Sequence, residues 1–149
     1  MTTHVRQQIR AKAVSLLRGL ATTGPNVYPG RSWPTGAAQL PALLVYTRTE
    51  QAQDATMMAQ TLQLRTVELV VEGRCRTASQ EPDDELDEIA LEVETALLAS
   101  GAFGTLIKSI ELKRSISASL ASQDRRSGEI ELTFDIEYLT AAGAPATAL

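Results

Sequence analysis

The sequence predicts an α+β fold in which two helices pack on one face of a mainly antiparallel or mixed β-sheet. Two segments carry the apolar spacing of amphipathic helices, and several others alternate apolar and polar residues as half-buried strands do. The strands come in runs with helices at only two places, which favours α+β over an alternating α/β order. A chain of 149 residues suits one core, so we expect residues 1–149 to form a single domain.

The first helix is predicted near the N-terminus. Its apolar residues recur at spacings of three and four and share one face: Val5, Ile9, Ala13, Leu16 and Leu20. Gly19 and the following TTGP end the pattern. Residues 24–41 hold four of the six prolines and are predicted to form a long loop with a short strand at Val27 and Tyr28. Loops of this length in compact domains are usually functional.

Two strands are predicted next. Residues 42–47, ALLVYT, form an apolar run typical of a strand buried on both faces, and the polar residues 48–60 are predicted to be a loop. In residues 61–77 the apolar phase changes near Arg65, which predicts a bulge or a bend there.

The clearest helix is predicted within residues 81–100, where one stripe contains Leu86, Ile89, Ala90, Val93 and Leu97. Pro82 and the early acidic residues suit its first turn, and Gly101 is expected to stop it. A strand follows in IKSIELKRSIS, with Ile110, Leu112 and Ile116 expected on one face. The polar turn 117–128 then leads to the last strand, residues 129–140. Residues 140–149 are expected to be a flexible tail.

The last strand has one apolar and one acidic side. Ile130, Leu132, Phe134, Ile136 and Tyr138 alternate with an acidic set that contains Glu129, Glu131, Asp135 and Glu137. We expect the acidic set on the open face of the sheet, joined by Glu111 and by Glu68 or Glu72. This face is either ordinary solvated surface or a surface whose negative charge has a function.

The sequence favours no enzymatic chemistry. His4 is the only histidine and Cys75 the only cysteine, so one chain cannot assemble a histidine-based triad, a histidine metal cluster or a disulfide. No phosphate-binding glycine loop is present, and the acidic segment 81–88 lacks the spacing of a calcium-binding loop. We therefore expect no catalytic residue, no metal and no cofactor. A net charge of −4 and a pI near 5.0 argue against electrostatic DNA binding.

No apolar segment is long enough for a signal peptide core or a membrane span, which predicts a cytoplasmic place of assembly. Charge is segregated along the chain. No acidic residue precedes Glu50, whereas eight acids and no base lie between Glu81 and Glu94. The two helices could neutralise each other within one subunit, or a basic surface could meet the acidic helix of a neighbouring subunit.

Three apolar residues are candidates for an interface. Leu91 and Leu98 lie away from the main stripe of the second helix and form either the edge of the core or a partner surface. Trp33, the only tryptophan, is either part of a local core or an interface anchor.

The order of elements resembles tail terminator proteins of long-tailed phages and gene transfer agents, the minor tail protein U type. The segments that carry the resemblance are RSWPTGAAQLPALLVYTRTE, DDELDEIALEVETALL and SGEIELTFDIEYLT, and it extends over roughly residues 3–140. It implies a ring, usually a hexamer, that caps the tail tube, stops its polymerisation and offers a docking surface to the head. The implied partners are other copies, the tail tube protein and the head–tail connector or neck protein, in the head-proximal tail of the virion.

The resemblance also implies a central hole through which DNA passes. On this basis Glu129, Glu131, Asp135 and Glu137 are candidates to face the channel, where negative charge would keep DNA from adhering. Loops 48–60 and 117–128 are candidates to contact the tube or connector, through Arg48, Arg125 and Arg126. Two alternatives remain: a head–tail joining or neck completion protein, and a carboxylate-dependent metal-binding enzyme.

Overall fold

The computed structural model describes residues 2–32, 39–57, 59–77, 81–121 and 126–149. The elements in chain order are α1 (Val5–Leu17), β1 (Val27–Pro29), β2 (Ala42–Asp54), β3 (Leu62–Thr77), α2 (Pro82–Leu97), β4 (Ser109–Ala121) and β5 (Arg126–Ala141). Two helices and a mixed sheet confirm the predicted α+β class. The short strand predicted at Val27 and Tyr28 is β1.

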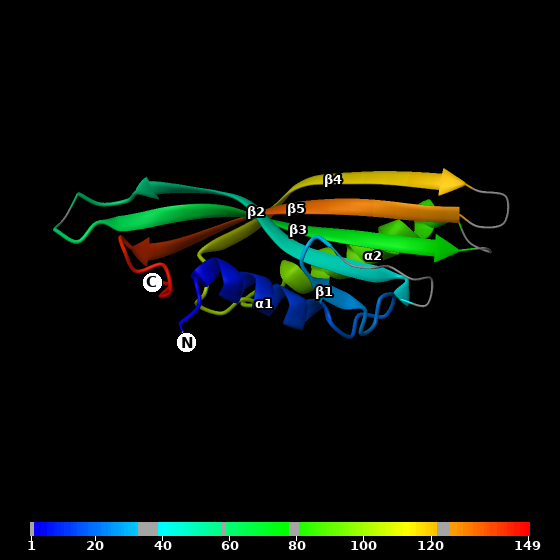
Figure 1. Ribbon diagram of the computed structural model, residues 1–149, viewed down its shortest axis with the longest axis horizontal. Helices are drawn as coiled ribbons and strands as arrows, with labels where there is room; N and C mark the ends of the chain where they lie inside the picture. The colour runs from blue at the N-terminus through cyan, green and yellow to red at the C-terminus, as the bar shows by residue number, and fades with distance from the viewer. Residues whose placement is uncertain (1, 33–38, 58, 78–80, 122–125) are drawn as a thin grey trace.

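The sheet has five strands in the order β1-β2-β3-β5-β4. β1 runs parallel to β2, and every other pairing is antiparallel. Both helices lie on the same face (Figure 1). α1 packs against β1 and β2, whereas α2 packs against β3, β5 and β4, so the two helices cover different halves of this face. The other sheet face, called here the open face, carries no helix within the described parts of the chain.

The core lies between the helices and the sheet. Leu86, Ile89, Val93 and Leu97 of α2 are buried together with the apolar side of β5, which runs from Ile130 to Tyr138. Full burial of each such aliphatic side chain stabilises the fold by about 1.5–3 kcal/mol. The helical and alternating spacing in the sequence therefore matches the residues that build the core.

The helix ends follow local chemistry. The ring of His4 caps α1, since its Nδ1 accepts a hydrogen bond from the backbone N–H of Arg6 at 3.0 Å. Pro82 begins α2 and acids occupy its first turn, where they favour the positive end of the helix dipole. α2 ends at Leu97, and the expected stop residue Gly101 lies in the turn that follows, with φ 73°.

β2 is longer than the sequence predicted. Residues 48–54 continue the strand instead of forming a loop, so β2 and β3 make a long hairpin joined by residues 55–61. We call residues 51–57 and 59–64 the hairpin arm, which reaches past the start of α1 (Figure 1). Residues 48–54 are nearly all polar, which removed the apolar signal by which strands are recognised.

The predicted bulge at Arg65 is wrong. β3 pairs with β5 in unbroken register from Leu62 to Thr77, and the irregularity lies in β2, between Thr47 and Glu50. β2 has one extra residue there, which reverses the alternation of its side chains between the two faces. Tyr46 therefore lies on the open face, whereas Glu50, four residues later, lies on the helix face opposite Val67. The phase change in β3 arises because Arg65 is a polar residue on the helix face, where it joins the polar contacts described below.

A second register shift in β4 overturns another expectation. Leu112 pairs with Phe134 and Arg114 with Thr133, so Lys113 is an extra residue. Ile110 and Leu112 pack against the core, but Ile116 lies opposite Glu131 on the open face and is 51% exposed. The three residues therefore do not share one face.

Residues 142–149 return beside the start of α1. The backbone N–H of Val5 donates to the carbonyl of Pro145 at 2.8 Å, and the Gln8 side chain donates to the carbonyl of Ala146 at 3.0 Å. The backbone N–H of Leu149 donates to Leu139 at 2.9 Å, while residues 140 and 141 belong to β5. These contacts locate the tail, and its flexibility remains a prediction.

Candidate assembly surfaces

The open face carries the four carboxylates proposed from the last strand. Register places Glu129, Glu131, Asp135 and Glu137 of β5 on this face, and Glu68 and Glu72 of β3 beside them. Glu111 of β4 lies opposite Asp135. Cross-strand alternation thus gathers acids that are distant in sequence onto one surface.

Basic side chains lie between these acids, a feature that the sequence analysis missed. Arg48 donates to Glu68 at 2.9 Å and to Glu131 at 3.2 Å, so it links β2, β3 and β5. Arg74 lies 3.3 Å from Glu72 and 3.7 Å from Glu129, and Lys113 lies 2.7 Å from Glu111 and 3.9 Å from Asp135. The open face is a lattice of ion pairs. Register was needed to find the contacts of Arg48, and those of Arg74 with Glu129 and of Lys113 with Asp135, because these pairs join different strands.

Arg48 has a different setting from the one predicted. The sequence predicts Arg48 in a loop that contacts the tube or connector, but the residue lies within β2 and points onto the open face, with 30% of its side chain exposed. Its two carboxylate partners hold the guanidinium in place. Arg48 therefore belongs to the surface that contains Glu131.

The other proposed interface residues are spread over the molecule. Arg126 begins β5 and forms an exposed ion pair with Glu81 at 2.7 Å. Leu91 and Leu98 on α2 are 66% and 42% exposed, so they are not part of the core edge. Trp33 and Arg125 lie outside the described residues.

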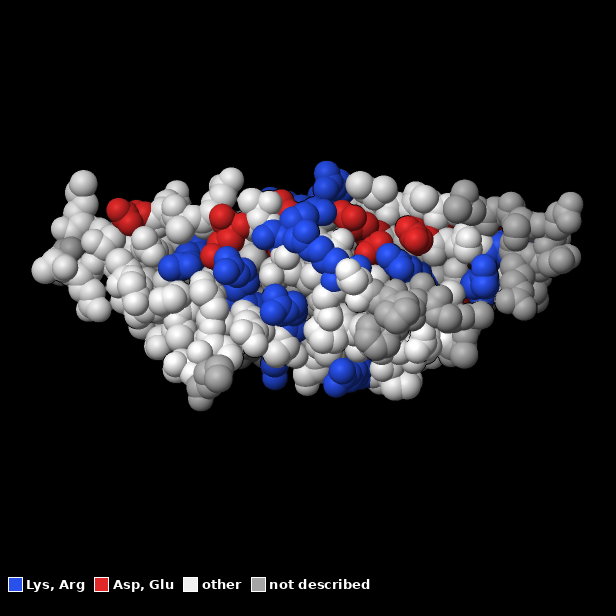
Figure 2. Space-filling model, in the orientation of Figure 1, with Lys and Arg blue, Asp and Glu red and all other residues white. Residues whose placement is uncertain are grey.

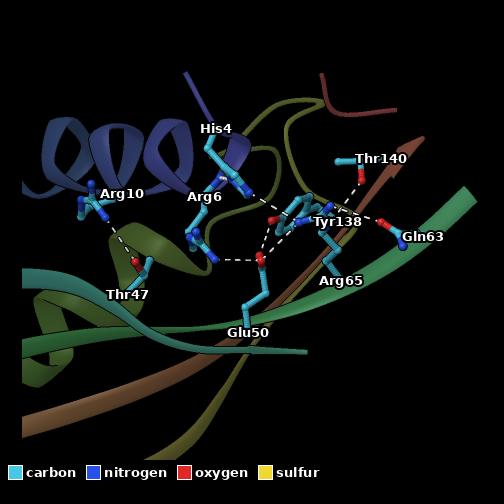
Figure 3. Close-up of polar contacts among 9 residues, drawn as sticks. All are labelled: His4, Arg6, Arg10, Thr47, Glu50, Gln63, Arg65, Tyr138 and Thr140. Carbon is cyan, nitrogen blue, oxygen red and sulfur yellow. Dashed lines mark hydrogen bonds and ion pairs between the residues drawn. The ribbon is translucent and has the colours of Figure 1, made fainter. Parts of the chain in front are cut away.

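A polar cluster at the base of the hairpin arm was not predicted (Figure 3). The Glu50 carboxylate lies 3.0 Å from Arg6 and 3.4 Å from Arg65, and it accepts a hydrogen bond from the hydroxyl of Tyr138. Burial and the bond to Glu50 raise the pKa of Tyr138. The cluster joins α1, β2, β3 and β5 where the apolar core ends. The only sequence signal for it was the polar Arg65 in an otherwise apolar phase.

His4 lies at the edge of this cluster. Its Nε2 is 3.5 Å from Arg65 Nη1. Partial burial and the positive charge of Arg6 lower the pKa of His4, an effect that Glu50 partly opposes and Arg65 reinforces. The ring is therefore favoured in its neutral form and serves the helix cap.

Cys75 is buried beneath the start of α2. Burial, reinforced by the nearby Glu85, raises the pKa of the Cys75 thiol to about 11. At neutral pH the group is a thiol, the unreactive form of cysteine. Within the described part of the chain, no group of three or more His, Cys, Asp or Glu side chains is placed to hold a metal ion. Of the helices described, neither is long and apolar enough to cross a membrane.

The charges of the two helices remain separate within the subunit. Among the described residues, the only ion pair that involves the acids from Glu81 to Glu94 is the one between Glu81 and Arg126. Glu92 instead accepts hydrogen bonds from the backbone N–H of Thr22 at 3.1 and 3.3 Å. Figure 2 shows Lys and Arg side chains gathered over α1 and the adjoining part of β2. Mutual neutralisation of the helices within one subunit is therefore not observed in the described structure.

The chain was compared with known proteins. A chain in the solved virion of a native gene transfer agent particle has a TM-score of 0.44 and 19% sequence identity, over 90% of this chain and 92% of that one. No curated protein matches the sequence significantly. Residues 4–138 match the family described as phage minor tail protein U. Because this match includes most of the chain, the protein belongs to the phage minor tail protein U family and is a structural component of phage-type tails.

Proposed function

We propose that the chain is a tail terminator: a ring of identical subunits, six in our proposal, caps the finished tail tube and stops its polymerisation. The observation that carries the proposal is the family match over residues 4–138. The ring then offers its other side to the head–tail connector or neck protein. The function is stoichiometric binding at the head-proximal end of the tail, reached by assembly in the host cytoplasm, and it needs no catalytic residue.

The open face is proposed to line the channel through which DNA passes. Alternating acids and bases on this face support this, because paired charges leave little net attraction for a phosphate backbone. Glu129 and Glu137 are the first and the last of the four acids that β5 places on the open face. Glu129 has 61% of its side chain exposed and only a 3.7 Å contact with Arg74. These two carboxylates would repel DNA phosphates that approach the face.

The test of the terminator proposal is decoration of tail tubes. Purified protein is mixed with tail tubes and, separately, with head connectors, and each mixture is imaged by negative-stain electron microscopy. We expect rings at tube ends only, and shorter tubes when the protein is present during polymerisation. Binding to connectors without binding to tubes would identify a neck protein and overturn the terminator proposal.

The channel proposal is tested by charge reversal at Glu129 and Glu137. Glu129 is preferable to Glu131, because Glu131 lies 3.2 Å from Arg48 and its replacement would break a closer contact than the 3.7 Å one between Glu129 and Arg74. We expect Glu129→Lys with Glu137→Lys to bind duplex DNA in a fluorescence-anisotropy titration, with affinity that falls as salt rises, whereas the natural protein stays free. Asp83→Lys with Asp84→Lys, on α2, makes the same change in net charge on the helix side and is the matched control. Equal DNA binding by both variants would contradict a channel role.

A further inference from the structure

Two surfaces of opposite charge lie toward opposite edges of this sheet. The basic flank contains Arg10 of α1, Arg18 at the C-cap of α1, and Arg31, beside β1 and β2. The acidic flank contains Asp87, Leu91 and Glu94 of α2 and its C-cap residue Leu98, beside β5 and β4. The strand order β1-β2-β3-β5-β4 separates these two sides.

The basic flank has neutral partners within the subunit. Arg10 donates to the hydroxyl of Thr47 at 3.2 Å, and Arg31 donates to the backbone carbonyl of the same residue at 3.1 Å. The Arg31 guanidinium also lies 5.1 Å from the centre of the Tyr46 ring. Both cations therefore converge on Thr47, and neither has a carboxylate partner among the described residues. Each guanidinium can therefore accept a carboxylate partner from outside the subunit.

The acidic flank points away from α1. Glu92 marks the side of α2 that faces the segment after α1, since it binds the backbone of Thr22. At about 100° per residue, Glu94 lies on the opposite side of the helix from Glu92, and Leu91 and Leu98 lie next to Glu94. Leu91 is 66% exposed and Leu98 is 42% exposed. An apolar pair bordered by carboxylates that have no ion-pair partner among the described residues is thus available to a partner.

We infer that the acidic flank of one subunit docks against the basic flank of a second copy of this chain. Charge complementarity identifies the occupant, because the surface that matches the acidic flank is present on the chain itself. The contact is heterologous: different surfaces meet, and repetition closes a ring when the rotation per subunit allows it. Two identical flanks would bring like charges together. This inference specifies the contact in the proposed ring and rests on that proposal.

The experiment uses charge reversal and its compensation. One variant carries Asp87→Lys and Glu94→Lys, a second carries Arg18→Glu and Arg31→Glu, and a third carries all four substitutions. Asp54→Lys, in the exposed hairpin arm, is the control. Circular dichroism verifies that each variant is folded, and mass in solution is measured by light scattering and analytical ultracentrifugation at low salt, with and without tail tubes.

We expect each two-site variant to need a concentration about tenfold higher or more for half-assembly, because both substitutions turn attraction into repulsion. The four-site variant should regain assembly, and so should an equal mixture of the two two-site variants. High salt should weaken assembly of the natural protein. Leu91→Asp should also reduce assembly, while Asp54→Lys leaves it unchanged.

The proposal is overturned if the two-site variants assemble like the natural protein, or if they fail and the four-site variant does not recover. A natural protein that stays monomeric with and without tubes overturns it as well. Rings that assemble with this charge dependence but ignore tube ends would support the contact and refute the terminator function, so the two proposals fail separately.

Discussion

Glu50 and Arg65 lie 3.4 Å apart at the base of the hairpin arm, with only 9% and 14% of their side chains exposed. The same carboxylate contacts Arg6 of α1 and accepts a hydrogen bond from Tyr138 of β5. The side chains of Arg6, Arg65 and Tyr138 thus share the Glu50 carboxylate as their partner, at the point where the apolar core ends. Removal of that acid leaves Arg65 mostly buried without its ion-pair partner.

We therefore predict that Glu50→Gln lowers the free energy of unfolding by about 3 kcal/mol, since breaking a mostly buried ion pair leaves an uncompensated charge. Urea denaturation followed by circular dichroism measures the change. Asp54→Asn removes the same charge from an exposed position of the same strand and should change stability by less than about 0.5 kcal/mol. Equal effects of the two substitutions would show that the Glu50 contacts contribute nothing specific.

The second prediction concerns pH and His4. Because the pKa of His4 is lowered in the folded state, the unfolded chain binds the proton more readily. The contribution of His4 to stability is therefore present above its ordinary pKa of 6.5 and is lost as pH falls through the lower folded value. The groups around the ring are Arg6, Glu50 and Arg65.

His4→Asn keeps a good helix cap but cannot titrate. Unfolding of both proteins is measured across a pH series that begins above 6.5 and descends. We expect the stability of the natural protein relative to His4→Asn to decline as pH falls, because carboxylate titrations are common to both. A constant difference over the whole series would refute this prediction.

The third prediction follows from the extra residue in β4. Ile116→Thr should change the free energy of unfolding by no more than about 0.5 kcal/mol, because Ile116 lies exposed on the open face. Leu112→Thr removes a partly buried apolar group that packs on the core and should cost about 1–2 kcal/mol. Thermal and urea unfolding of the two variants gives the comparison. A larger loss at position 116 than at position 112 would mean that Ile116 packs inward.

The fourth prediction concerns Gly128, where β5 passes under the start of α2. A Cβ atom there would lie 2.9 Å from Leu86 Cδ1 and 3.2 Å from Pro82 Cβ, closer than apolar contacts allow. Gly128→Ala should destabilise the protein by about 1–3 kcal/mol through overpacking. Ser127→Ala, one residue earlier, should have a free energy of unfolding close to that of the natural protein. Unaltered stability of Gly128→Ala would show that α2 can move away from the sheet at little cost.

The sequence predicted the features that depend on regular spacing. Both helices were found because their apolar residues recur on one side, and the helix-facing side of β5 was found from its alternation. The extent of β2 was missed because its outer half is polar, and the position of Ile116 was missed because one added residue reverses the alternation. A bulge has no residue type of its own, so composition did not reveal it.

The candidate surfaces likewise include features that the sequence could predict and features that it could not. The acidic set on β5 was visible because all four members belong to one strand. The pairing of Arg48 with Glu131 joins residues from β2 and β5, and the bond between Tyr138 and Glu50 joins β5 and β2. Such contacts depend on strand order and register, which local patterns do not contain. The exposure of Leu91 and Leu98 likewise depended on how α2 lies on the sheet.

The extra residues in β2 and β4 have a consequence for how relatives of this chain can diverge. Beyond each bulge, the side chains that unbroken alternation would place on one face of the sheet lie on the other face. A deletion of one residue at either place would exchange Glu50 or Ile116 with its neighbours between the two faces, with no other substitution. Gains and losses of single residues in these two strands are therefore an efficient way to give a relative a new surface on the same scaffold.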